Sequence, residues 1–214
     1  MKTTVLFDMD GVISDTQDMQ AEIESQLLKR FGILIPGKEI TKRYAGVKTS
    51  EFFKDLLDKK KAVYDIDKLM DEKRKKVITN VKKELNEIPD SVELIKKLHK
   101  DGYKLAVASA SNRKLVEIIL KKLKIKKYFL AVITGDDVKK GKPNPESYLL
   151  AARSVHSKPS ECIVIEDGVN GMQSGKNAKM FVIGLVPKNS KLEYPADLLV
   201  NTHKQTMSLD FKEL

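Results

Sequence analysis

The sequence predicts a doubly wound α/β fold, in which helices cover both faces of a parallel sheet, with an all-helical unit inserted near the start of the chain. Three observations support this prediction. Short, nearly continuous apolar runs alternate with helical patterns, several of these runs end in acidic or hydroxyl side chains, and residues 16–86 contain no good strand. Continuous apolar runs are typical of parallel strands that are buried on both faces, and their alternation with helices indicates repeated β–α units.

The predicted core comprises residues 1–15 and 87–214. Its expected strands are the runs TTVLFD (3–8), YKLAVAS (103–109), FLAVIT (129–134), CIVIED (162–167) and MFVIGL (180–185). Helical spacing of apolar residues between 115 and 123 predicts one intervening helix. The stretch NPESYLLAARSV predicts another, with Asn144 as its N-cap and Pro145 in its first turn.

Residues 16–86 are predicted to form a helical cap on this core. Met19, Ile23, Leu27 and Phe31 recur every four residues on one helical face, and further helical patterns cover 49–58 and 65–85. The insert is bordered by GVISD and by NEIPDS, whose proline breaks the helix. A unit that is joined by two short linkers could move as a lid or pack rigidly on the core, and the sequence leaves both possibilities open.

Composition limits the function classes. The 214-residue chain carries a net charge of +10, from 40 Lys and Arg against 30 Asp and Glu, but its lysine clusters at 59–61, 73–76 and 121–127 are interleaved with acids and lack alternating aromatic residues. We interpret them as a solvated surface rather than a specific nucleic-acid interface. The single Cys162 allows no internal disulfide, and no apolar run reaches membrane-spanning length. We therefore expect a cytoplasmic monomer without a membrane partner.

Several strands deliver polar side chains to one edge of the predicted sheet, where ligands bind in open parallel sheets. These residues are Asp8, Asp10, Ser109, Lys142, Glu166 and Asp167. Each has an ordinary explanation when taken alone; for example, Asp15 is expected to cap the first inserted helix, and Asp136 and Asp137 are expected to shape a turn. Together, however, the carboxylates repel one another unless a cation joins them, and an all-oxygen cluster suits Mg²⁺.

This constellation predicts phosphoryl transfer. A carboxylate beside Mg²⁺ is a competent nucleophile toward phosphorus, because the metal screens its charge from an anionic phosphate. A lysine and a hydroxyl from neighbouring strands can hold the phosphoryl oxygens. A second acid, two residues after the first, can protonate the leaving oxygen and then deprotonate a water molecule.

Four motifs, in this order, resemble those of the haloacid dehalogenase superfamily. They are FDMDGV, VASASN, GKPNPESY and VIEDGVNGMQSGKNAKM, and they run from residue 5 to about residue 185. The helical insert is similar to the small cap of the subgroup that contains β-phosphoglucomutase and many sugar-phosphate phosphatases. The resemblance therefore implies a Rossmann-like core, an aspartyl-phosphate intermediate and Mg²⁺ as cofactor.

The resemblance also implies a role for each motif residue. Asp8 would be the nucleophile, and Asp10 would be the general acid and base. The implied phosphate-binding residues are Ser109, Ala110 and Lys142. The implied metal ligands are Asp8, the backbone carbonyl of Asp10, Asp167 and Glu166, the last either directly or through a metal-bound water. The presence of an acid at position 10 matches phosphatases and mutases, whereas dehalogenases and phosphonatases lack it.

Cap residues separate hydrolysis from mutase chemistry. The substrate-selecting residues are expected to be Thr16, Gln20, Gly46, Lys48 and Thr49. β-Phosphoglucomutase resembles this chain around Asp15 and Thr16, but it has a histidine in place of Gln20 and basic residues in place of Ala45 and Thr49. Two departures from the wider family pattern lie in the fourth motif: Lys179 replaces a usual glycine, which is costly if its backbone is left-handed, and Gly168 replaces a common serine.

Three hypotheses follow. The first is a Mg²⁺-dependent phosphatase that acts on a small phosphorylated metabolite, with a phosphosugar as the expected substrate. The second is a phosphomutase of the β-phosphoglucomutase type. The third is a non-enzymatic, basic binding module, which the clustered acids, hydroxyl and lysine argue against.

Overall fold

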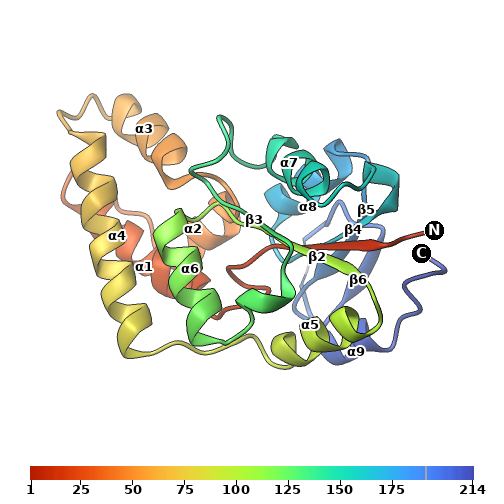
Figure 1. Ribbon diagram of the computed structural model, residues 1–214. Helices are drawn as coiled ribbons and strands as arrows, with labels where there is room; N and C mark the ends of the chain where they lie inside the picture. Colours follow the sequence, from red (N-terminus) through yellow and green to blue (C-terminus); the bar gives the residue numbers. More distant parts are fainter. Residues whose placement is uncertain (191) are drawn as a thin grey trace.

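The computed structural model describes residues 1–190 and 192–214 and confirms the doubly wound α/β fold (Figure 1). Six parallel strands form one sheet in the order β3-β2-β1-β4-β5-β6. The strands are β1 (Thr4–Phe7), β2 (Lys104–Ala108), β3 (Ala131–Ile133), β4 (Cys162–Glu166), β5 (Phe181–Leu185) and β6 (Leu198–Val200). The first five match the predicted runs, whereas β6, a three-residue edge strand, was not predicted.

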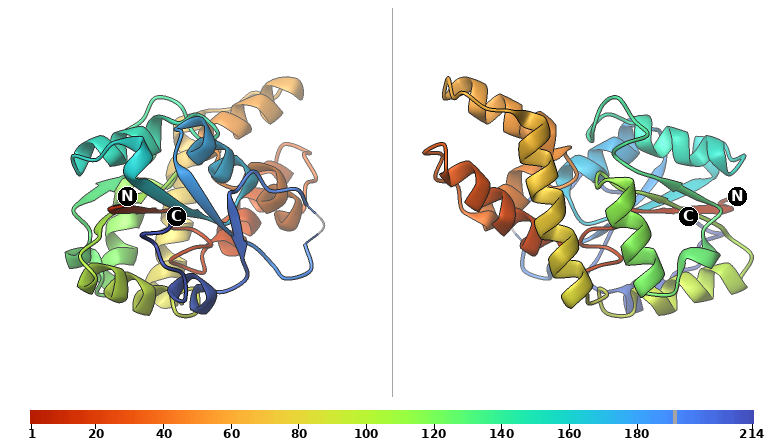
Figure 2. Two further views of the ribbon diagram at one scale, coloured as in Figure 1. Left: turned by 90° about the vertical axis from the view of Figure 1, so that its right-hand side faces the viewer. Right: turned by 60° about the vertical axis from the view of Figure 1, so that its left-hand side comes forward.

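Side chains alternate between the two faces of this sheet, as a strand requires. In β1, Val5 and Phe7 belong to the apolar cluster of one face, and Leu6 belongs to that of the other. Helices α5 (Ser91–Lys100), α6 (Arg113–Lys122) and α9 (His203–Met207) cover the first face, and α7 (Glu146–Ser154) and α8 (Val169–Asn177) cover the second (Figure 2). Both faces are therefore buried, which explains why the strand runs are continuously apolar.

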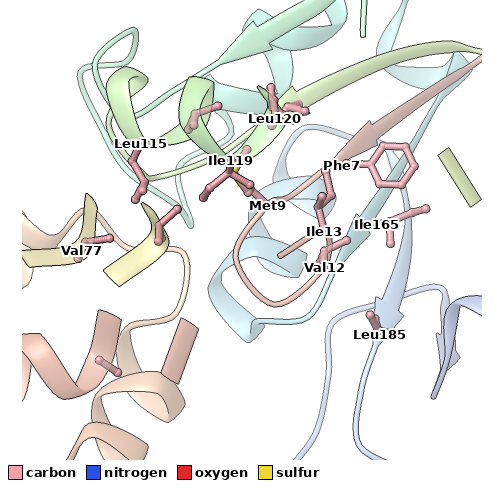
Figure 3. Packing of buried hydrophobic residues seen from close by; sticks show 14 of the residues in the cluster. Phe7, Met9, Val12, Ile13, Val77, Leu115, Ile119, Leu120, Ile165 and Leu185 are labelled. Atoms are coloured by element: carbon pink, nitrogen blue, oxygen red, sulfur yellow. The ribbon is translucent and has the colours of Figure 1, made fainter. Parts of the chain in front are cut away.

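The segment between β1 and α5 is helical throughout its regular structure. It contains α1 (Gln17–Lys29), α2 (Gly37–Tyr44), α3 (Thr49–Lys59) and α4 (Ile66–Lys83), and it lies beyond the ends of the strands (Figure 1). Its long helix α4 packs on α6 of the core, where Val77 lies near Leu115 and Ile119 (Figure 3). We keep the name helical insert for residues 16–86.

Local details confirm the expected turn at Asp136 and Asp137 but correct both helix-cap predictions. Lys179 has a φ of +58°, as the motif departure suggested. The prediction of Asn144 as the N-cap of the following helix was wrong: α7 begins at Glu146 with Pro145 as its N-cap, and Asn144 Oδ1 accepts a hydrogen bond from the Glu146 N–H at 3.0 Å in the turn before the helix. The prediction for Asp15 was wrong: Thr16 is the N-cap of α1, and the Asp15 side chain is exposed.

The expected turn at Asp136 and Asp137 is present. The Asp137 carboxylate accepts hydrogen bonds from the Thr134 backbone N–H and hydroxyl at 2.8 and 2.7 Å, and Asp136 accepts one from the Arg113 N–H at 2.8 Å. Among the helices of residues 1–190 and 192–214, none combines the length and the apolar character that crossing a bilayer requires.

Candidate active site

The three central strands bring their polar ends to one place. Asp8 follows β1, Ser109 follows β2 and Asp167 follows β4, and β1 lies between the other two. The sheet fixes the first two through their own backbones, because Asp8 N–H donates to Ile165 O and Ser109 N–H donates to Ile133 O, both at 3.0 Å. The site therefore occupies the crevice where the strand order reverses direction.

Lys142 lies at the centre of this crevice with only 2% of its surface exposed. Its Nζ lies 2.5 Å from Asp8 Oδ1, 2.6 Å from Glu166 Oε1 and 3.0 Å from the carbonyl oxygen of Ala108. The buried hydroxyl of Tyr148 completes the group: it accepts from Lys142 at 3.1 Å and donates to Glu166 Oε1 at 2.8 Å. The ammonium group is thus held rigidly against the carboxylate of Asp8.

Burial and mutual repulsion shift the pKa values of this group. Burial, reinforced by the charge of Glu166, raises the pKa of Asp8 from 3.8 to about 8, although Lys142 opposes the shift. Burial followed by the charges of Glu166 and Asp8 raises the pKa of Asp167 well above its ordinary value. For Lys142, burial disfavours the charged form, but the two neighbouring carboxylates outweigh it and raise the pKa. Lys142 therefore stays charged, whereas the protonated forms of Asp8 and Asp167 are favoured because one ammonium group does not compensate three ionised carboxylates.

The donor set fits a divalent cation such as Mg²⁺. Asp8, Glu166 and Asp167 each offer an oxygen, and these oxygens lie within 4.8 Å of one another. Glu166 is the most occupied of the three, since Oε1 binds Lys142 and Tyr148, and Oε2 accepts from the Asp167 and Gly168 N–H groups at 3.0 and 3.2 Å. Its hydrogen bonds suit it to position Lys142, which leaves Asp8 and Asp167 as the more available ligands.

Gly11 allows Asp167 to approach the loop after β1. Its φ is +88°, and a Cβ atom at this position would lie 2.1 Å from Asp167 Oδ2. Both the backbone conformation and the lack of a side chain are needed here, since L-residues rarely adopt such a φ and a methyl group would displace the carboxylate. The sequence Asp8-Met9-Asp10-Gly11, which we call the DxDG motif, therefore needs glycine at its last position for a steric reason.

Asp10 points toward the helical insert rather than toward Lys142. Its Oδ1 accepts from Gln20 Nε2 at 2.6 Å and from the Thr16 hydroxyl, while its Oδ2 accepts from the Ser111 hydroxyl at 2.8 Å. Ser109 Oγ lies 3.5 Å from the same Oδ2. The second carboxylate of the motif is thus held between the core and the insert, beside the first carboxylate but with a separate set of partners.

A cavity of about 70 Å³ lies between the core and the insert. Asp8, Asp10 and Ala110 line it from the core, and Gln20, Gly46 and Thr49 are among the residues that line it from the insert. Lys48 lies outside this lining; its Nζ donates to the carbonyl oxygen of Val138 at 2.9 Å. Four of the five expected selecting residues thus contact Asp10 or line the cavity. The side chain of the fifth, Lys48, instead packs against a loop of the core.

The insert packs closely against the core, where it contacts the backbone of Gly141. Glu51 Oε1 accepts from the Gly141 N–H at 2.9 Å, and a Cβ at Gly141 would lie 2.9 Å from the backbone nitrogen of Lys48. Gly46, with a φ of +80°, lies against the side chain of Lys142, since a Cβ there would be 3.2 Å from Lys142 Cδ. The loop before α3 therefore covers the lysine that contacts Asp8.

A family model described as haloacid dehalogenase-like hydrolase matches residues 5–185, which include both carboxylates of the DxDG motif, Lys142 and Asp167. The chain belongs to this family. It is 30% identical to a phosphorylated carbohydrates phosphatase of Thermotoga maritima over 81% of this chain and 80% of the relative. It is 28% identical to a β-phosphoglucomutase of Bacillus subtilis over 98% and 92%.

Solved structures of the family agree with this fold. A β-phosphoglucomutase from Clostridium difficile superposes with a TM-score of 0.86 at 25% identity, covering 100% of this chain and 95% of that one. The similarity extends through the helical insert as well as the sheet, since the whole chain is covered. The shared fold thus includes the segments on both sides of the cavity.

Sequence reasoning missed four residues of this site. Ser111 lies within the VASASN motif, but its hydrogen bond to Asp10 depends on the orientation of the Asp10 carboxylate toward the insert, which the motif does not reveal. Tyr148 lies six residues after Lys142, in the first turn of α7, and its sequence context is that of an ordinary core residue. Glu24 and Lys73 line the cavity from α1 and α4, and nothing in their local sequence distinguishes them from surface charges.

Proposed function

We propose that this protein is a Mg²⁺-dependent phosphatase that hydrolyses a phosphate monoester of a small metabolite, with a phosphosugar as its substrate class. One observation carries the proposal: a buried ammonium group lies 2.5 Å from the carboxylate of Asp8, while the carboxylate of Asp10 faces the cavity under the insert. A nucleophile, a cation for the phosphoryl oxygens and a separate acid are thus available on one side of the sheet.

In the first step, an Asp8 carboxylate oxygen attacks phosphorus. The new Asp8–phosphorus bond forms as the phosphorus–ester oxygen bond breaks, and Asp10 donates its proton to the departing oxygen. Lys142 and the Ser109 hydroxyl hold the phosphoryl oxygens and offset their charge. The products of this step are the free alcohol and an aspartyl-phosphate on Asp8.

In the second step, water replaces Asp8 on phosphorus. Asp10, now ionised, removes a proton from the water molecule, whose oxygen attacks phosphorus while the Asp8–phosphorus bond breaks. Inorganic phosphate leaves and both carboxylates return to their starting states. Mg²⁺ would be held by Asp8, Asp167 and the backbone carbonyl of Asp10. Glu166 would bind it directly or through a water molecule. When bound, the metal supplies a positive charge that screens the carboxylates from the phosphate.

The cavity has room for a phosphoryl group but is smaller than the roughly 300–1,000 Å³ of typical ligand pockets. We propose that the helical insert moves outward to admit the substrate, which would break contacts such as those of Lys48 and Glu51 with the core loop at 138–141. The sequence left open whether the insert moves as a lid or packs rigidly on the core, and this proposal favours the lid.

Mutase chemistry is the second candidate, supported by the similarity to β-phosphoglucomutases along nearly the whole chain. The relative named as a phosphorylated carbohydrates phosphatase supports the first candidate, hydrolysis. Two features favour hydrolysis. Gln20, an uncharged amide, binds Asp10 at the place where the mutase has a histidine, and Thr49 replaces a basic cap residue that helps hold a second phosphate.

The test is a panel of phosphate monoesters that includes hexose phosphates, together with the acyl phosphate acetyl phosphate, assayed for free phosphate with Mg²⁺ and with EDTA. The proposal predicts phosphate release that EDTA and Asp8→Asn both abolish. Asp101→Asn, a matched change at an exposed surface ion pair, should have no effect. Conversion of glucose 1-phosphate to the 6-phosphate with little phosphate release would instead establish a mutase, and salt-sensitive polyanion binding without turnover would establish a binding module.

A further inference from the structure

A second buried ion pair lies in the cavity wall. Lys73 Nζ is 2.5 Å from Glu24 Oε1, and the two side chains are only 14% and 8% exposed. Outside the Lys142 group, the next most buried ion pair of the described residues, Lys176–Asp197, is 38% and 28% exposed. A buried ion pair is weak evidence for stability, because desolvation offsets most of the attraction between the charges. Its presence beside the cavity calls for a functional explanation.

Thr49 joins this pair to form a three-residue group, which we call the Glu24 cluster (Glu24, Thr49 and Lys73). The Thr49 hydroxyl donates to Glu24 Oε1 at 2.8 Å and accepts from Lys73 Nζ at 2.6 Å. The three residues come from α1, α3 and α4, and all three line the same cavity as Asp8 and Asp10. The cluster is therefore assembled only when the helices of the insert are packed together.

The cluster lies farther from the reaction centre than Gln20 does. Gln20, which binds Asp10, and Glu24 are four residues apart in α1, so they share one face and are separated by about 6 Å along the helix axis. A phosphoryl group at Asp8 would place its ester oxygen near Asp10. The carbon chain beyond that oxygen would then extend toward Glu24.

The unused hydrogen-bonding capacity of the cluster indicates what it binds. Glu24 Oε1 accepts a hydrogen bond from Thr49 and forms the ion pair with Lys73, whereas Oε2 receives no hydrogen bond from the residues that the structure describes. Lys73 has three N–H groups, one of which donates to Thr49, and its ammonium group forms the ion pair with Glu24. One acceptor and one donor therefore remain, and a hydroxyl group can satisfy both. The pair is electrically neutral, so a second phosphate would meet the Glu24 carboxylate without a surplus cation.

We infer that the Glu24 cluster binds the hydroxyl groups at the end of the substrate remote from the phosphate and selects against a second phosphate at that end. The inference rests on the proposed phosphatase function and specifies its substrate: a polyhydroxylated monophosphate rather than a bisphosphate.

The experiment compares kcat/KM for ribose 5-phosphate, fructose 1-phosphate and glucose 6-phosphate with that for acetyl phosphate, which has no hydroxyl group. Glu24→Gln should lower kcat/KM for the best of these phosphosugars at least tenfold more than for acetyl phosphate, chiefly through KM. It should also raise the ratio of fructose 1,6-bisphosphate to monophosphate turnover, because Lys73 then carries an unpaired charge. The control is Glu72→Gln, which removes a partly exposed carboxylate from α4, the helix that carries Lys73, and should change neither ratio.

If Glu24→Gln folds poorly, the double variant Glu24→Leu with Lys73→Met removes both charges and should fold, because no buried charge is left unpaired. It should show the same selective loss on phosphosugars. Equal loss on every substrate, or no change in the bisphosphate ratio with Glu24→Gln, would overturn the inference while leaving the phosphatase proposal intact. Failure of the wild-type protein to hydrolyse acetyl phosphate and all the phosphosugars would overturn the proposed function itself.

Discussion

Lys142 holds the site together electrostatically, and its replacement by methionine tests that role. Lys142→Met retains an unbranched apolar side chain but removes the ammonium group from between Asp8 and Glu166, at 2.5 and 2.6 Å. Removing one partner of a buried ion pair leaves an uncompensated charge and costs about 3–5 kcal/mol. For a chain of this size each kcal/mol lowers the unfolding temperature by roughly 2–4 °C. We expect a decrease of roughly 6–20 °C at pH 7 without Mg²⁺.

Thermal unfolding followed by circular dichroism measures this decrease. Adding Glu166→Gln to Lys142→Met should recover part of the lost stability, since it removes one of the two buried carboxylates that Lys142 no longer pairs with. Lys140→Met, at an exposed neighbouring position, is the control. A Lys142→Met protein that unfolds within about 2 °C of wild type would refute the reasoning, because it would show that Lys142 does not neutralise buried carboxylates.

Three further outcomes are expected. Asp10→Asn should lower kcat by roughly 10²–10⁴ for alkyl phosphates, with a smaller effect on p-nitrophenyl phosphate, whose leaving group needs no proton; equal losses would exclude Asp10 as the acid. The folded-state pKa of Asp8 is raised from 3.8 to about 8, so without Mg²⁺ the wild type should lose stability as the pH rises from 4 to 8. Asp8→Asn should weaken that slope in pH-dependent urea unfolding, and an unchanged slope would contradict the assignment. Lys179→Gly should raise the unfolding temperature by roughly 2–4 °C, since it removes about 1 kcal/mol of left-handed strain; no rise in calorimetry would refute this.

The core could be predicted because burial on both sheet faces leaves a clear signal. The strand that ends at Asp8 and the strand that ends at Asp167 are continuously apolar, and the rule that strand ends share one edge then brings the two carboxylates together. The edge strand Leu198–Val200 was missed because it has three residues, of which Leu199 is 48% exposed, so it lacks the continuous apolar run of a central strand.

The insert was less predictable because its interior is partly polar. Lys73 lies in the sequence DEKRKK, which was interpreted as a solvated helix surface, yet its side chain is only 14% exposed. Its neighbours Glu72 and Arg74 do face solvent, so the composition of this stretch is a poor guide to its single buried charge. Only the packing of α4 against α1 distinguishes Lys73, through a contact with Glu24 that lies far away in sequence.

The Asp15 prediction failed for a related reason. An acid just before a helix is a reasonable N-cap, but Thr16 takes that place in α1 and gives its hydroxyl to Asp10 instead of to the helix. The side chain that would ordinarily stabilise the helix end is used to orient a carboxylate of the candidate active site. Local propensity and function compete at this position, and the sequence alone does not reveal which one prevails.

The central claim is that Asp8 accepts the phosphoryl group, and acid-quenched mass spectrometry of the protein during turnover of acetyl phosphate tests it most directly. The account predicts a phosphorylated peptide that contains Asp8 when Mg²⁺ is present, and no such peptide after EDTA treatment or in Asp8→Asn. Phosphate release that continues in Asp8→Asn, with the Asp8 peptide unmodified in the wild type, would contradict it.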